Sequence, residues 1–147
     1  MRKQILFIAA LLAAPASAQL PGLRRYAPSQ AAPVLNSIEA LRADFSAQSG
    51  GAQIYFTYGS IDILPQARPL LAAQAAWLRT HPEVAARIEG YGDSTDTRDH
   101  ALAVGARRAE QVRDYLVLMG VPPAQLTATS WGKERPGAPR VVTVLVR

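Results

Sequence analysis

The chain has 147 residues, with 16 basic and 11 acidic side chains and no cysteine. This length predicts one domain with a single hydrophobic core. The missing cysteine excludes disulfide bonds and predicts an unlipidated protein, since lipid attachment after export needs a cysteine. The charge of +5 falls to about +3 when Arg2 and Lys3 are removed with the export signal. No basic run or aromatic-basic motif is present, so no nucleic-acid ligand is expected.

Residues 1–18 have the three parts of a secretory signal peptide. A short basic start precedes the apolar run "ILFIAALLAA", and "ASA" ending at Ala18 supplies the small residues of a cleavage site. The apolar run is shorter than the roughly 20 residues that span a bilayer, so we expect no membrane span in the mature protein. The sequence therefore predicts export with cleavage after Ala18.

Residues 19–33 are rich in Pro, Gln, Ser and Ala without an apolar period, which predicts a flexible lead-in. The next segment predicts a helix over 34–48. Its apolar residues recur at helical spacing, namely Val34, Ile38, Leu41 and Phe45, and "SGG" ends the segment.

Four β-rich segments follow, at 52–58, 84–92, 125–131 and 140–146, with helical patterns at about 66–80 and about 100–119. The order βαβαββ predicts an α+β domain over 52–147, with two layers and helices packed on one face of a mixed sheet. In the last helix, apolar or small residues recur at three and four, namely Leu102, Gly105, Ala109, Val112, Leu116 and Met119. If Leu102 and Ala109 define the core face, Arg108 lies on a flank about 100° away.

The stretch "GYGDSTDTRDH" (90–100) combines three aspartates with a histidine. Carboxylates and imidazole suit a divalent cation, so a metal-dependent hydrolase is one alternative. However, no calcium-loop or HExxH spacing is present. Asp96 and Asp99 also suit the first turn of a helix, with Asp96 or Thr97 as its N-cap. We therefore predict no metal and no cofactor.

Five segments, taken together and in order, resemble the OmpA-like C-terminal domain shared by OmpA, MotB and the peptidoglycan-associated lipoprotein Pal. They are "IYFTYGSIDI", "HPEVAARIEGYGD", "GARRAEQVRDYL", "GVPPAQLTATSWGKERP" and "PRVVTVLV". The resemblance covers roughly 53–146, and the Pal type is the most similar.

The resemblance implies a non-enzymatic periplasmic protein, outer-membrane-associated or free, that binds the peptide stem of peptidoglycan through diaminopimelate. It assigns the main ligand contacts to Asp93 and Arg108, and it places Phe56, Thr57 and Arg140 nearby. The chemistry agrees, because diaminopimelate presents an ammonium and a carboxylate together. A carboxylate can bind the ammonium, and the planar guanidinium fork suits the carboxylate.

Two readings compete with this one. Asp93 and Arg108 form either a ligand pocket or a structural ion pair between loop and helix. The domain is either a wall binder or a degenerate module that contacts other envelope proteins. Departures from the family pattern near the pocket leave both open. They fall at Tyr91, Gly92, Ala101, Ala103, Ala138 and Pro139.

Overall fold

The computed structural model describes residues 37–146. The predicted signal peptide, the lead-in and Val34 lie outside them. The elements are α1 (Ile38–Ser49), β1 (Gln53–Tyr55), η1 (Pro65–Ala67), α2 (Arg68–Thr80), β2 (Ala85–Tyr91), α3 (Arg98–Leu118), η2 (Pro123–Gln125), β3 (Leu126–Gly132) and β4 (Arg140–Val146). None of these helices is both long and apolar enough to cross a bilayer.

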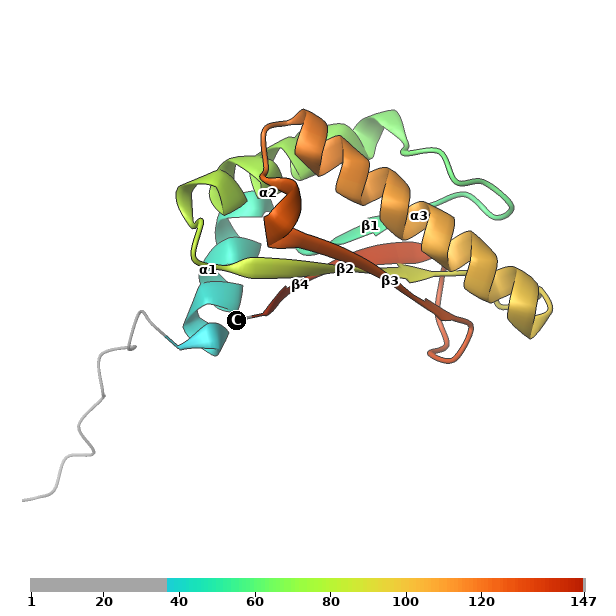
Figure 1. Ribbon diagram of the computed structural model, residues 1–147. Helices are drawn as coiled ribbons and strands as arrows, with labels where there is room; N and C mark the ends of the chain where they lie inside the picture. Colours follow the sequence, from blue (N-terminus) through green and yellow to red (C-terminus); the bar gives the residue numbers. More distant parts are fainter. Residues whose placement is uncertain (1–36, 147) are drawn as a thin grey trace, which may run out of the picture. The chain divides into compact units, whose positions relative to one another are not determined.

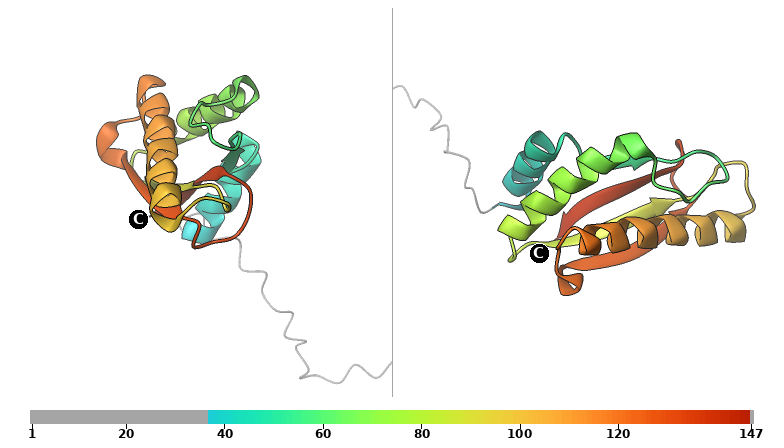
Figure 2. Two further views of the ribbon diagram at one scale, coloured as in Figure 1. Left: turned by 90° about the vertical axis from the view of Figure 1, so that its right-hand side faces the viewer. Right: turned by 90° about the horizontal axis from the view of Figure 1, so that it is seen from above.

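The four strands form one mixed sheet in the order β1-β4-β2-β3. Strand β4 pairs antiparallel with both β1 and β2, whereas β2 and β3 run parallel. Helices α2 and α3 lie on the same face of this sheet, and α2 lies between α1 and α3 (Figures 1 and 2). The predicted α+β fold, βαβαββ after a first helix, is confirmed.

Helix α1 is fixed by one cap and two side-chain contacts. The Ser37 hydroxyl accepts a hydrogen bond from the Ala40 backbone N–H, which fixes the helix start at Ile38 rather than at the predicted residue 34. Phe45 packs edge-on against Trp77 of α2, with ring centroids 5.2 Å apart. Arg42 donates to the carbonyl of Leu145, so α1 also binds the end of β4.

Helix α3 lies unusually close to β2 because glycines face each other. A Cβ placed on Gly90 would collide with the backbone carbonyl of Gly105, and a Cβ on Gly92 would collide with the backbone of Ala101. These contacts set which face of α3 is turned toward the sheet. They also bring the start of α3 against the loop that follows β2.

The predicted core face of α3 is confirmed at Gly105, Ala109, Val112 and Leu116, but it is wrong at Leu102. Leu102 is 47% exposed, while Ala101 and Arg108 are fully buried together with Ala109 and Val112. The small residues that allow close approach, rather than the large Leu102, determine the inward face. Arg108, which was predicted to lie on a flank of the helix, therefore lies in the interior.

Candidate ligand-binding site

A buried ion pair joins the loop after β2 to the middle of α3. The Nη1 atom of Arg108 lies 2.8 Å from Oδ1 of Asp93, and their side chains are 0% and 4% exposed. The close contact between α3 and β2 places the two groups together, although fifteen positions separate them in the chain. The structure therefore brings together the two residues to which the resemblance assigns the main contacts.

Backbone carbonyls take up most of the remaining donors of Arg108. Its Nε donates to Ser60 O at 2.8 Å, its Nη1 to Tyr91 O at 3.0 Å and its Nη2 to Thr57 O at 3.2 Å. The guanidinium also lies 5.4 Å from the centre of the Phe56 ring. A guanidinium has five N–H donors, so these contacts leave little capacity unused.

The second carboxylate oxygen of Asp93 is bound by the segment after β1, which also supplies the Thr57 and Ser60 carbonyls. Oδ2 accepts a hydrogen bond from Gly59 N at 2.6 Å. Gly59 belongs to a β-turn in which Ser60 N donates to Thr57 O at 3.1 Å, and its φ of 71° lies in the left-handed region that favours glycine. The turn Thr57–Ser60 thus closes over the ion pair.

Strand β1 ends earlier than the predicted 52–58. Phe56 N still donates to Pro139 O at 3.0 Å, but the Thr57 carbonyl then turns to Arg108. Phe56 is buried and Thr57 is exposed. The residues that were missed, Gly59 and Ser60, act through backbone atoms. Only the turn pattern "YGS" hints at them.

Arg140 does not join this group. Its register partner is Tyr55 of β1, and its guanidinium lies 3.9 Å from the centre of the Tyr91 ring of β2. The neighbouring Val141 and Gly90 are buried under the helices, so the alternation of strands places Arg140 and the Tyr91 ring on the opposite face of the sheet. The Tyr91 carbonyl still contacts Arg108, but its side chain does not.

The departures from the family pattern have different surroundings. Ala101 is fully buried, and its backbone lies so close to Gly92 that a Cβ on Gly92 would collide with it. Ala103 is exposed on α3, and Pro139 is buried where its carbonyl pairs with Phe56. The exposed Ala138 offers its carbonyl to Arg140. The small residues Gly92 and Ala101 therefore complement each other.

The other ionisable residues of "GYGDSTDTRDH" do not converge on Asp93. Thr97 is the N-cap of α3, because its hydroxyl accepts from His100 N. Asp96 Oδ2 lies 3.5 Å from the His100 ring. No group of three or more metal-binding side chains occurs within residues 37–146. The Thr97 cap supports the helix-entrance interpretation of this stretch.

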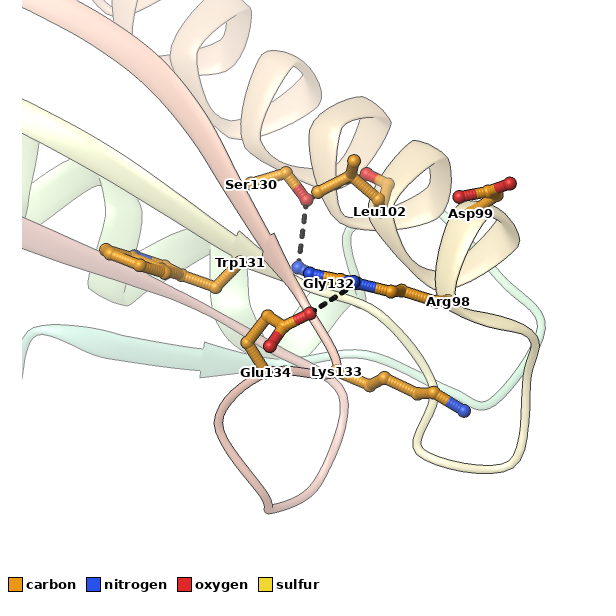
Figure 3. A pocket seen from close by; sticks show the side chains of 8 residues that line it. All are labelled: Arg98, Asp99, Leu102, Ser130, Trp131, Gly132, Lys133 and Glu134. Atoms are coloured by element: carbon orange, nitrogen blue, oxygen red, sulfur yellow. Dashed lines mark hydrogen bonds and ion pairs between the residues drawn. The ribbon is translucent and has the colours of Figure 1, made fainter.

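Asp99 belongs to a separate hollow of about 280 Å³ between α3 and the end of β3. Figure 3 shows its lining, with Arg98 directed toward Glu134 and the Trp131 ring directed away. The Arg98–Glu134 ion pair, at 2.7 Å, lies between exposed side chains. Such a pair contributes at most about 1 kcal/mol to stability.

Comparisons with known proteins agree with this fold. The model of the OmpA family matches residues 55–143, so the chain belongs to the OmpA family. The match includes Asp93 and Arg108. The predicted family is therefore confirmed.

Two relatives are similar in sequence, and both are named peptidoglycan-associated lipoprotein. The one from Agrobacterium fabrum is 42% identical over 88 residues, which are 60% of this chain and 50% of the relative. The one from Pseudomonas aeruginosa is 39% identical over 102 residues, or 69% of this chain and 60% of the relative. The chain thus spans about half the length of the relatives it matches. Both names describe an association with peptidoglycan.

Solved structures show the same architecture. The peptidoglycan-associated lipoprotein from Burkholderia pseudomallei superposes with a TM-score of 0.64 at 32% identity, covering 78% of this chain and 98% of that one. The C-terminal domain of Helicobacter pylori MotB has a TM-score of 0.58 at 24% identity, covering 63% and 81%. The MotB similarity shows the fold alone.

Proposed function

We propose that this protein is a non-catalytic module of the cell envelope that docks on peptidoglycan stems through diaminopimelate. The observation that carries the proposal is the Asp93–Arg108 pair at the strand end. Membership of the OmpA family, and relatives named for their association with peptidoglycan, support it. The predicted signal peptide, with cleavage after Ala18, would deliver the protein to the periplasm.

The ligand would replace contacts that the protein now makes with itself. Asp93 accepts from one backbone N–H, that of Gly59, and an ammonium can take this position. Arg108 donates to the carbonyls of Ser60 and Thr57, and a carboxylate can accept both bonds. The amino-acid end of diaminopimelate carries both groups. We therefore propose that the turn Thr57–Ser60 moves aside when the stem binds.

Phe56 and Thr57 would line the strand side of the opened site. Phe56 already packs near the guanidinium and is buried, so it supports Arg108 from below. Arg140 lies across the sheet, and we give it no direct contact with the diaminopimelate end. Its predicted role as a ligand residue would require contact with another part of the polymer.

A second candidate function is an interaction module for other envelope proteins that has lost wall binding. The contacts of Arg108 favour this second function, because most of its N–H donors already bind groups of its own chain. In this case the pair would simply fix the loop to α3. Wall binding distinguishes the two candidates directly.

The test combines a ligand series with protein variants. Wild-type protein should sediment with diaminopimelate-containing sacculi at low salt, and it should bind a stem tripeptide with diaminopimelate at least about tenfold more tightly than one with lysine. Lysine lacks the terminal carboxylate, and one lost charged interaction of about 1.4 kcal/mol corresponds to that factor. This comparison needs no variant, so it holds even where a variant unfolds.

Asp93→Asn, tested at a temperature where circular dichroism shows a folded protein, should abolish sedimentation. Arg107→Gln is the matched control, because Arg107 is the exposed neighbour of Arg108 on the same helix. Equal binding of the two stems, or no sedimentation of the wild type, would reject wall binding through this pair. The interaction-module function would then remain.

A further inference from the structure

The exposed apolar side chains of the domain are few and unevenly placed. Within residues 37–146, four large hydrophobic side chains are exposed, namely Tyr55, Tyr58, Leu102 and Leu118. Isolated exposed apolar residues are common and need no function. Position therefore decides whether any of them has a role.

Tyr58 lies between two residues, Thr57 and Gly59, that each form a hydrogen bond with the ion pair. Thr57 accepts a hydrogen bond from Arg108 through its carbonyl, and Gly59 donates to Asp93. Tyr58 occupies the second position of the turn Thr57–Ser60, and it is 58% exposed. An aromatic ring is thus carried at the tip of the turn that covers the proposed stem site.

Tyr55 provides the contrast, because it has the same side chain at nearly the same exposure, 57%. It lies in β1 beside the buried Ile54, so alternation places its ring on the face of the sheet away from α2 and α3. No hydrogen bond within residues 37–146 joins Tyr55 to Asp93 or Arg108. The two tyrosines differ in their relation to the ion pair.

We propose that Tyr58 is an aromatic subsite for the amino-sugar rings of the glycan to which the bound stem is attached. This inference rests on the proposed function. The charged groups of peptidoglycan lie mainly on its stems, whereas a pyranose ring offers an apolar C–H face. An exposed aromatic ring matches that face, and an ionic pair does not. The ionic pair would select the stem, and Tyr58 would favour stems still joined to sugar.

The experiment measures two ligands with each protein by calorimetry. One is a free diaminopimelate-containing tetrapeptide, and the other is the same tetrapeptide on its disaccharide. Wild-type protein should bind the second about three- to tenfold more tightly, as expected for one aromatic contact. Tyr58→Ala should lose this gain while keeping its affinity for the free peptide. Tyr58→Phe should keep both, because stacking needs the ring and not the hydroxyl.

Tyr55→Ala is the matched control and should behave as wild type with both ligands. Equal affinity of the wild type for the two ligands would overturn the inference and leave the proposed function standing. An equal loss for both ligands in Tyr58→Ala would also overturn it, because the ring would then act by shaping the turn. A wild type that binds neither ligand would reject the proposed function itself, and the subsite with it.

Discussion

The buried ion pair allows a sharp prediction about stability, namely the effect of Asp93→Asn. The carboxylate now satisfies two donors with separate oxygens, Arg108 Nη1 at 2.8 Å and Gly59 N at 2.6 Å. An amide has one acceptor oxygen, so its NH2 group must face one of these donors. The substitution also leaves the fully buried Arg108 without its counter-charge.

Removing one partner of a buried pair costs about 3–5 kcal/mol, because the remaining charge stays desolvated. A domain of this size has a free energy of unfolding of about 5–15 kcal/mol, so the loss is a large share. With a urea m value of about 1.5 kcal/mol/M, a loss of 3 kcal/mol lowers the unfolding midpoint by about 2 M. Intrinsic fluorescence of the buried Trp77 can follow the transition.

Asp114→Asn is the control, since its carboxylate lies 3.5 Å from Arg113 and is 73% exposed. Its loss should stay below about 0.5 kcal/mol. A loss below about 1 kcal/mol for Asp93→Asn would refute the reasoning. It would mean that water reaches the pair in solution and that the turn Thr57–Ser60 does not close over it.

Three further predictions concern other contacts. The pKa of the Asp44 carboxyl is lowered below its usual 3.8, first by the hydrogen bond from Trp77 Nε1 and then by Gln48. The stability this gives is present above pH 3.8 and is lost as the pH falls through the lowered pKa. In an acid titration, the free energy of unfolding of Asp44→Asn should therefore decrease less than that of the wild type. Gly90→Ala should cost about 2 kcal/mol or more in urea unfolding, because its Cβ meets the Gly105 carbonyl, which cannot rotate away. Thr97→Ala should cost about 1 kcal/mol in thermal unfolding through loss of the α3 cap.

The sequence predicted the order of elements because each has a strong local signal. A run of β-branched residues marks β4. The apolar period of α3 ends at Met119, just before Gly120, where φ is 97°. The helix cap is also a local signal. Thr97, one of the two predicted cap positions, accepts a hydrogen bond from the N–H of His100, three residues later. Such signals need no knowledge of distant contacts.

The positions of Leu102 and Arg108 on α3 were predicted wrongly for a physical reason. Patterns count arginine as outward and leucine as inward, but here Arg108 finds its partners inside and Leu102 does not. The partners are carbonyls up to 51 positions away, which no local pattern contains. The small residues Ala101 and Gly105 indicate the inward face, because they allow α3 to approach β2 and the residue after it closely.

The contacts that stabilise the turn Thr57–Ser60 also limit the affinity of any ligand that binds at this site. A stem that binds Asp93 and Arg108 must first release the bonds to Gly59, Ser60 and Thr57, so its affinity is the difference between two similar sets of interactions. This argues for modest affinity per site and for dependence on many sites along a polymer. A variant that weakens the turn but keeps the side chains of Asp93 and Arg108 should therefore bind the stem more tightly. Gly59→Ala is such a variant, because its φ of 71° strains any residue with a Cβ while no neighbouring atom is displaced. If Gly59→Ala instead bound the stem more weakly than the wild type in the calorimeter, the backbone of the turn would make contacts with the stem rather than compete with it.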